Sequence, residues 1–303
     1  MTTRLRRSEL STPASSEKMM GKAAASDADL VFLDLEDSVA PKEKERARGL
    51  AVTALRELDF GRKTRAVRVN GPDTPWAYAD TITVVEGAGD RLDLIIVPKV
   101  KAPRDVWFFD TLLTQLERKL GLRHRIGIEI LIEEVEALAC VEELARCCPR
   151  LESLILGVGD LSASQGMKLG QIGHTDERYP GDIWHFARAR LVVAARAAGI
   201  DAIDGPYASF RNPEGFVREA ARAAALGFVG KWAIHPSQIE LANQVFAPTD
   251  EEIANARKVI AEVRKAEDEG KGSAQGSDGG VMIDAATARI FQVIVDRAEQ
   301  MGR

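Results

Sequence analysis

The sequence has few cysteines and no long apolar run. Its three cysteines, Cys140, Cys147 and Cys148, all fall in or at the end of one predicted helix. That spacing suits neither a disulfide framework nor a zinc site, so a reducing, cytoplasmic location is expected. No stretch approaches the roughly 18 apolar residues of a transmembrane helix, so no membrane span is expected.

The chain also lacks an excess of basic residues and an apolar leader. Its 41 Lys and Arg residues against 46 Asp and Glu residues give a formal net charge of −5. This balance argues against nucleic acid as a partner. The N-terminal stretch is basic but has no apolar core, unlike a secretory signal. With 303 residues, 45% of them apolar, the chain is long enough for one barrel-sized domain.

Short apolar strand patterns recur along the chain, and helix patterns fill most of the connections between them. Eight strand patterns lie at Arg7, Val31, Arg65, Leu94, Ile126, Leu154, Ala202 and Lys231. Strands and helices that alternate in this number are typical of a (β/α)8 TIM barrel. We therefore predict an α/β fold with a barrel over residues 1–245 and a C-terminal helical extension over residues 246–303.

The extension has two helix patterns separated by a Gly/Ser-rich run. The first pattern covers Thr249 to Glu269 and the second Ala285 to Ala298. The run between them, GKGSAQGSDGG, predicts a flexible linker. A helical tail after a linker suggests packing on a neighbouring subunit. Within the barrel region, residues 166–180 are expected to form a long loop.

Two carboxylates follow neighbouring strand patterns in the middle of the chain. Glu133 ends the pattern Ile126 to Ile132, and Asp160 ends the pattern Leu154 to Val158. A helix pattern lies between them, and a strand–helix–strand unit brings both strand ends to one side of a parallel sheet. Two carboxylates there would suit a hard cation. The alternative is that Glu133 supplies charge at a helix N-terminus and Asp160 is an N-cap.

Other charged side chains lie at or near predicted strand ends. Glu36 and Asp37 follow one strand, and Arg68 lies within the next. A strand arginine needs an anion, either a neighbouring strand-end carboxylate or a substrate carboxylate. Lys99 could form a Schiff base or act as a cation that balances the acidic strand ends, and we favour the second role.

Two lysines share a face of the first predicted helix. Lys18 and Lys22 are four residues apart, so they form either a solvated surface or an anion clamp. His235 follows the last strand pattern, where a lone histidine is more often structural than a base.

Seven motifs, in this order along nearly the whole chain, resemble the citrate lyase β-subunit-like enzymes of the HpcH/HpaI aldolase superfamily. They are LDLEDSV, RAVRVNGPDTPW, IVPKV, LIEEVEAL, LGVGDLSASQG, AIDGPY and GKWAIHPSQI. Within that family the sequence is most similar to the L-malyl-CoA/β-methylmalyl-CoA lyase branch, through NGPDTPWAY, DTLLTQ, SASQGM, YPGDIWH and VMIDAA.

The resemblance implies a TIM barrel and roles for several residues. Mg²⁺, with Mn²⁺ as an alternative, would be bound by Glu133 and Asp160. Arg68 would hold the glyoxylate part of the substrate. Asp284, in the MIDAA motif, would reach the active site of a neighbouring subunit in a homotrimer or homohexamer. There we expect it to exchange a proton with the acyl carbon.

The remaining expected roles concern metal-bound water and coenzyme A. Glu36 and Asp37 would order water molecules on the metal. The segment SSEKMMGKA resembles the coenzyme A site, which gives Lys18 and Lys22 a phosphate-binding role. Ile234 and His235 would lie on the nucleotide side of the coenzyme A site.

The expected function is a Mg²⁺-dependent carbon–carbon lyase that acts on a coenzyme A thioester. It would reversibly cleave a 3-hydroxyacyl-CoA, such as L-malyl-CoA or β-methylmalyl-CoA, to glyoxylate and acetyl-CoA or propionyl-CoA. Four alternatives stay open: a malyl-CoA thioesterase, a citramalyl-CoA lyase, a non-catalytic acyl-CoA-binding subunit and a Schiff-base aldolase at Lys99.

Overall fold

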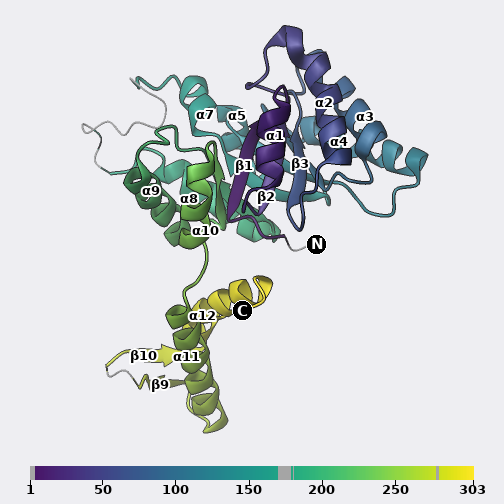
Figure 1. The fold of residues 1–303 in the computed structure, drawn as a ribbon. Helices are drawn as coiled ribbons and strands as arrows, with labels where there is room; N and C mark the ends of the chain where they lie inside the picture. Colours follow the sequence, from purple (N-terminus) through teal and green to yellow (C-terminus); the bar gives the residue numbers. More distant parts are fainter. Residues whose placement is uncertain (1–3, 170–178, 180, 278–279) are drawn as a thin grey trace. The chain divides into compact units, whose positions relative to one another are not determined.

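The computed structural model describes residues 4–169, 179, 181–277 and 280–303. It divides into two compact units (Figure 1). One comprises Arg6–Asn243, and the other comprises Gln244–Arg303 with the described residues Arg4 and Leu5. Most of the loop expected at residues 166–180 lies outside the described residues. Among the helices described, none is long and apolar enough to cross a membrane.

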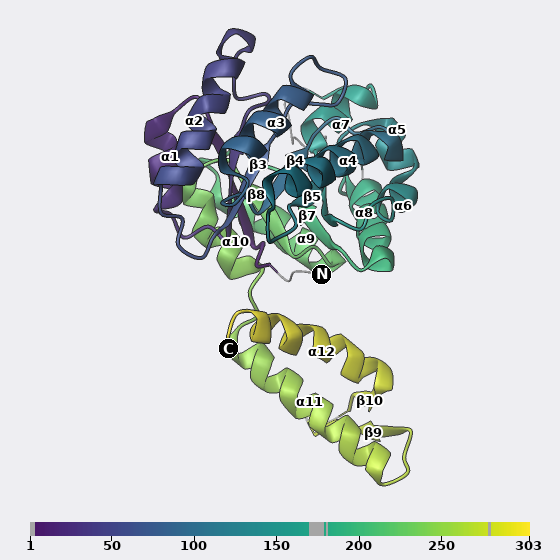
Figure 2. The same cartoon turned by 90° about the vertical axis from the view of Figure 1, so that its right-hand side faces the viewer.

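The first unit is a closed barrel of eight parallel strands, which confirms the predicted fold class. Neighbours in the barrel follow sequence order, and β8 closes on β1 with Ser8 opposite Lys231. Helices surround the strands (Figure 2). The strands are β1 (Ser8–Pro13), β2 (Leu30–Asp34), β3 (Thr64–Arg68), β4 (Leu94–Val97), β5 (Gly127–Ile132), β6 (Leu151–Leu156), β7 (Asp201–Asp204) and β8 (Gly230–Ala233).

The helices of this unit follow the strands in the expected alternation. They are α1 (Glu17–Ala24), α2 (Lys44–Glu57), α3 (Ala77–Ala88), α4 (Pro103–Leu120), α5 (Val135–Ala139), α6 (Val141–Leu144), α7 (Val158–Ser164), α8 (His185–Ala198), α9 (Pro213–Leu226) and α10 (Ile239–Val245), with short 3₁₀ turns at Pro41–Glu43 and Pro236–Gln238. The helix pattern between Glu133 and Asp160 predicted one continuous helix from Val135 to Cys148, and this prediction is wrong. Cys140, at φ −119° and ψ 26°, leaves the helical conformation and separates α5 from α6.

Apolar side chains fill the inside of the barrel, where residues at alternate positions of each strand point inward. The interior cluster contains Leu30, Phe32, Ala66, Leu94, Ile96, Leu131, Ile155, Ile203 and Trp232. A packed interior keeps ligands out of the lumen, so polar chemistry is left to the two ends of the barrel.

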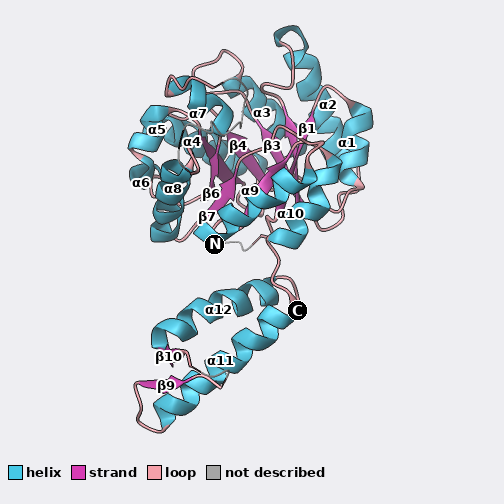
Figure 3. Cartoon of the chain, turned by 90° about the vertical axis from the view of Figure 1, so that its left-hand side faces the viewer, coloured by secondary structure: helices cyan, strands magenta, loops and turns pink. Residues whose placement is uncertain are grey.

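The second unit is a helical pair with a small antiparallel sheet (Figure 3). It contains α11 (Asp250–Asp268), β9 (Ser273–Gln275), β10 (Met282–Asp284) and α12 (Ala285–Gln300). The prediction that the whole Gly/Ser-rich run is a flexible linker is wrong, because part of it forms β9, which pairs with β10. Ala274 on β9 packs on an apolar cluster that includes Val259, Val263 and Ile283. Tertiary packing thus outweighs a local composition that favours no structure.

Candidate active site

Five charged side chains come together where neighbouring barrel strands end. Because the strands are parallel, their C-terminal ends form one rim, which we call the mouth of the barrel. Ion pairs link these side chains across the mouth. They are Glu36 after β2, Arg68 at the end of β3, Lys99 after β4, Glu133 after β5 and Asp160 after β6.

Three carboxylates converge on the ammonium group of Lys99, and we call Glu36, Glu133 and Asp160 the carboxylate cluster. Lys99 Nζ lies 2.6 Å from Asp160 Oδ1, 3.7 Å from Glu133 Oε1 and 4.0 Å from Glu36 Oε1. Burial acts to lower the pKa of Lys99, but Glu133, Asp160 and Glu36 raise it. These contacts agree with Lys99 as a cation that balances acidic strand ends.

Glu133 is held in a closely fitted position. It is 2% exposed, and its Oε1 accepts a hydrogen bond of 2.8 Å from the backbone N–H of Lys99. Gly157 leaves room for it, because a Cβ added at Gly157 would lie 2.6 Å from the Cβ of Glu133. Burial raises the pKa of Glu133 to about 8 against the influence of Lys99. A carboxylate this buried needs a cation beside it to stay charged at neutral pH.

Asp160 lies in the first turn of α7, not directly at the strand end. Its side chain is 46% exposed, so it forms the open side of the carboxylate cluster. The alternative role as an N-cap is wrong, because Gly157 is the N-cap of α7. Glu133 likewise precedes the N-cap of α5, which is Glu134. Neither carboxylate is therefore a helix-capping residue.

Arg68 is buried and bound to two carboxylates of the chain. Its Nε and Nη2 each donate a hydrogen bond of 2.7 Å to Asp34, and its Nη1 lies 2.8 Å from Glu36 Oε2. The guanidinium also lies over the Trp232 ring, 5.4 Å from its centroid. The predicted pairing with a strand-end carboxylate is confirmed. A guanidinium has five N–H donors, so these three contacts leave two for a substrate anion.

Asp34 belongs to the same group of contacts, although its place in the sequence did not predict this. Besides binding Arg68, it accepts hydrogen bonds from the backbone N–H groups of Glu36 and Ser38, at 2.9 and 3.2 Å. Burial acts to raise the pKa of Asp34, but Arg68 and these donors lower it. The sequence contained one clue, because Asp34 interrupts the apolar run from Leu30 to Leu35.

The loop that carries Glu36 is also held from behind by Lys44. The ammonium of Lys44 donates to the carbonyl oxygens of Leu35 and Glu36, at 2.8 and 2.7 Å. Burial raises the pKa of Glu36 to about 7, with Arg68 acting in the opposite direction. Asp37 is exposed. Glu36 therefore belongs to the mouth, whereas the next carboxylate faces solvent.

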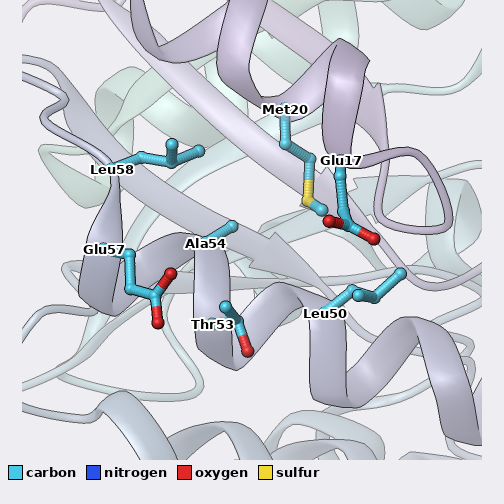
Figure 4. Close-up of a pocket in the computed structure, with 7 residues that line it drawn as sticks. All are labelled: Glu17, Met20, Leu50, Thr53, Ala54, Glu57 and Leu58. Atoms are coloured by element: carbon cyan, nitrogen blue, oxygen red, sulfur yellow. The ribbon is translucent and has the colours of Figure 1, made fainter.

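The residues expected to bind coenzyme A are exposed and come from α1 and from the segment after β8. Lys18 and Lys22 are solvent-exposed on α1. Ile234 is 40% exposed, and the His235 ring stacks on Phe210 with centroids 4.8 Å apart. A cavity of about 100 Å³ lies between α1 and α2, lined by Glu17, Met20, Leu50, Thr53, Ala54, Glu57 and Leu58 (Figure 4). Neither lysine lines this cavity.

Asp284 belongs to the second unit, where it caps α12. Its Oδ1 accepts hydrogen bonds from the backbone N–H and the hydroxyl of Thr287, at 2.9 and 3.1 Å. These hydrogen bonds lower the pKa of Asp284, which favours the ionised form. Its expected place in the active site of a neighbouring subunit concerns a second chain and stays a prediction.

The donor chemistry of the mouth fits a hard divalent cation. Across the described residues, no group of three or more His, Cys, Asp and Glu side chains is arranged to hold a metal ion. Glu133 and Asp160 offer carboxylate oxygens, and the Lys99 ammonium already lies between them as a cation. An ion held by two such side chains would complete its coordination with water and substrate oxygens, as Mg²⁺ commonly does.

Comparisons with known proteins agree with this architecture. A family model described as HpcH/HpaI aldolase/citrate lyase matches residues 7–236. A second model, described as a C–C bond lyase of the TIM-barrel fold, matches residues 183–302. Together the two matches span both units of the chain.

Individual relatives extend over nearly the whole chain. The L-malyl-CoA/beta-methylmalyl-CoA lyase of Cereibacter sphaeroides is 43% identical over 305 residues, covering 98% of this chain and 95% of that protein. A malyl-CoA/beta-methylmalyl-CoA/citramalyl-CoA lyase of Chloroflexus aurantiacus is 32% identical, covering 92% and 83%. The structure of CitE from Mycobacterium tuberculosis with magnesium, acetoacetate and coenzyme A has a TM-score of 0.75 and 27% identity, covering 96% and 97%.

Proposed function

The chain belongs to the HpcH/HpaI aldolase/citrate lyase family, and we propose that it is a divalent-metal-dependent carbon–carbon lyase for 3-hydroxyacyl-CoA thioesters. The reaction would reversibly cleave L-malyl-CoA or β-methylmalyl-CoA to glyoxylate and acetyl-CoA or propionyl-CoA. One observation carries the proposal: Glu133 and Asp160 meet at the barrel mouth beside a buried arginine that keeps unused donors. The names of the relatives at 43% identity support the substrate class.

Glu133 and Asp160 are the proposed metal ligands, for Mg²⁺ or alternatively Mn²⁺. When bound, such an ion supplies Lewis-acid polarisation of the substrate hydroxyl and carbonyl oxygens and lowers the pKa of the hydroxyl. The burial of Glu133 fixes one ligand, while the exposure of Asp160 leaves the other side open to substrate and water. Glu36, and Asp37 from the exposed side, would order water in this region.

Arg68 is proposed to bind and orient the substrate carboxylate that becomes part of glyoxylate. Its two unused N–H donors are available for this, because Asp34 and Glu36 account for the other three. Asp34 fixes the plane of the guanidinium, so binding would need little reorganisation. An arginine held in this way also stabilises the negative charge that develops as the carbon–carbon bond breaks.

Asp284 is proposed to exchange a proton with the acyl carbon in the active site of a neighbouring subunit. In the condensation direction, its ionised carboxylate would accept a proton from the carbon next to the thioester carbonyl. In the cleavage direction, the same carboxyl group would return the proton to that carbon. The lowered pKa of Asp284 favours the ionised form that begins condensation. This role requires a homo-oligomer, for which a trimer or hexamer is our proposal.

Coenzyme A is proposed to lie across α1 and the segment after β8. Lys18 and Lys22 are exposed, and neither has an ion-pair partner within the described part of the chain, so both are available for phosphate groups. Ile234 and His235 would contact the nucleotide. A cytoplasmic location is part of the same proposal, supported by three cysteines that form no disulfide.

The test is an assay of the purified protein with malyl-, methylmalyl- and citramalyl-CoA, with and without Mg²⁺. We expect glyoxylate to be released from the first two substrates, and activity to be lost in EDTA and restored by Mg²⁺. Pyruvate from citramalyl-CoA would favour the citramalyl-CoA lyase alternative, and free coenzyme A with malate would show a thioesterase. No turnover of any thioester, or full activity in EDTA, would overturn the proposal.

A further inference from the structure

Lys99 has a backbone conformation that is unusual for a lysine. Its φ is +55°, and it is the one non-glycine residue with a positive φ in the ranges that the structure describes. Residues with a Cβ atom rarely adopt this left-handed conformation, because the Cβ crowds the following carbonyl oxygen. Strain of this kind persists where surrounding contacts impose it, often at functional sites.

The contacts of Lys99 show what the conformation achieves. Its backbone N–H donates to Glu133 Oε1 at 2.8 Å, while its Nζ lies 2.6 Å from Asp160 Oδ1. Both nitrogens of one residue therefore face the two proposed metal ligands. The ammonium lies among the three side chains of the carboxylate cluster, and the lysine side chain is 20% exposed.

Gly71 leaves room for the stem of this lysine. A Cβ added at Gly71 would lie 3.1 Å from Lys99 Cβ and 3.2 Å from Lys99 Cγ, a tight contact for any side chain. The stem thus runs along backbone that carries no side chain. Three features of the fold therefore determine where the ammonium lies: the positive φ of Lys99, the absence of a side chain at Gly71 and the carboxylates around the ammonium.

We propose that Lys99 is a built-in competitor of the divalent cation. Its ammonium neutralises Glu133 and Asp160 in the metal-free protein and leaves Asp160 when an ion binds. The inference rests on the proposed metal site. The ammonium and a bound ion would compete for the carboxylate oxygens of Asp160, and the two cations would repel each other. Glu36, at 4.0 Å from the ammonium, is the acceptor within reach once the ammonium is displaced.

Competition has a consequence that a purely structural lysine does not. If the ammonium must be displaced, removing it strengthens the binding of a divalent ion, because the ion no longer competes with or faces a positive charge. If Lys99 only stabilises the fold, removing it weakens or leaves unchanged the binding of the ion. The sign of the change in metal affinity therefore distinguishes the two roles.

The experiment measures Mn²⁺ affinity by electron paramagnetic resonance of the free ion, using the full chain without substrate. Lys99→Met removes the ammonium at similar size, and Lys99→Gly also relieves the backbone strain. Lys101→Met is the matched control, because it removes the same charge two residues away and Lys101 has no ion pair with the carboxylate cluster in the described structure. We expect both Lys99 variants to bind Mn²⁺ about tenfold more tightly than the natural chain, and Lys101→Met to bind it within about twofold.

A second measurement uses thermal unfolding with and without saturating Mn²⁺. The shift of the midpoint on Mn²⁺ binding should be larger in Lys99→Met than in the natural chain, because tighter binding stabilises the folded state more. Glu133→Gln tests the proposed metal site separately from the competitor role of Lys99. If it abolishes Mn²⁺ binding while neither Lys99 variant binds more tightly, the competitor role is overturned and the metal site stands. If the natural chain binds no Mn²⁺, or Glu133→Gln binds it unchanged, the metal site and this inference both fail.

Discussion

The two ends of the barrel each bury an arginine among carboxylates, yet they differ in what the cation can do. At the N-terminal ends of the strands, which we call the base, Arg6 contacts Glu129, Glu152 and Asp201 through Nε, Nη2 and Nη1, at 2.7, 2.5 and 3.4 Å. Its side chain is 1% exposed. Each nitrogen of the guanidinium contacts a carboxylate, and the side chain is closed off from solvent. A ligand from solution therefore cannot reach the Arg6 guanidinium.

At the mouth, the corresponding cluster is shared between a fixed cation and a replaceable one. The Arg68 side chain is 9% exposed against 1% for Arg6, and the Lys99 ammonium lies beside Asp160, whose side chain is 46% exposed. A guanidinium fork makes several directed hydrogen bonds, whereas an ammonium is a point charge that another cation can replace. A buried excess of carboxylates is thus not a site by itself. Solvent access and a replaceable cation distinguish the mouth from the base.

Trp232, in the interior cluster, contacts a charged residue on each side of it. Its ring lies under Arg68, and its Nε1 donates a hydrogen bond of 2.8 Å to Glu9 near the base. Glu9 is fully buried. One interior side chain therefore contacts Arg68 at the mouth and Glu9 near the base.

The largest expected effect comes from a substitution that disrupts the mouth and leaves the base unchanged. Glu133→Gln should lower kcat/KM by about 10³-fold or more, because it removes a proposed metal ligand and with it several kcal/mol of charge stabilisation. The unfolding midpoint should change little, since a buried carboxylate becomes a neutral group of equal size. Steady-state kinetics with calorimetry would measure both, with the exposed Glu136→Gln as control. Unchanged kcat/KM would contradict the ligand assignment.

The next largest effect comes from a substitution that disrupts the base and leaves the mouth unchanged. Arg6→Met should lower the free energy of unfolding by about 3–5 kcal/mol, because Glu129 and Glu152 lose their buried counter-charge. The kcat per folded molecule should stay the same. Urea unfolding with active-site titration would measure this, and Arg7→Met, which removes a half-buried pair with Asp29, should cost less. A loss of kcat in the folded fraction would show that the ends are coupled.

A third test concerns the second unit. Asp284→Ala should lower kcat by about 10²-fold, within the usual range for loss of an acid–base group, with a smaller change in KM. It also removes the N-cap of α12, at a cost of about 1 kcal/mol. Asp284→Asn serves as control, because it can keep the cap and lose the base. Turnover of Asp284→Asn within about threefold of the natural chain would contradict the proton-exchange role.

The smallest expected effect is a pH dependence of stability that arises at Glu9, near the base. Burial, and then Glu129, raise the pKa of Glu9 well above its usual value. Above its ordinary pKa the unfolded chain releases this proton while the folded chain retains it, so stability falls as pH rises towards the raised pKa. Glu9→Gln removes this dependence. Its advantage in unfolding midpoint should therefore grow from pH 5 upwards, as thermal scans would show, and a constant difference would contradict a protonated Glu9.

The fold was largely predictable because local patterns determine it. Alternating apolar strands and amphipathic helices imply the barrel, and positions at or just after strand ends led to the proposal of Glu133 and Asp160 as metal ligands. The break at Cys140 was not predictable, because the apolar spacing continues through it. The pairing of β9 with β10 was missed for a related reason, since a Gly/Ser-rich run has no local preference and its structure depends on distant partners.

The parts of the site that could not be predicted depend on register and backbone conformation. Asp34 binds Arg68 only because the β2–β3 register sets them opposite each other. The base cluster joins Arg6 to Asp201 across most of the barrel sequence, which no local pattern reveals. Lys99 was recognised as a charge-balancing cation, but its positive φ depends on contacts with the surrounding structure.

Because β8 pairs with β1, the barrel can close only after its last strand has been synthesised. The first strand to emerge can pair on one side with β2, but its other edge stays open until β8 has been synthesised. An open strand edge invites pairing with other nascent chains unless charged side chains interrupt it. Arg6 and Arg7 directly precede β1 and Glu9 lies within it, so charged side chains interrupt this edge while it is unpaired.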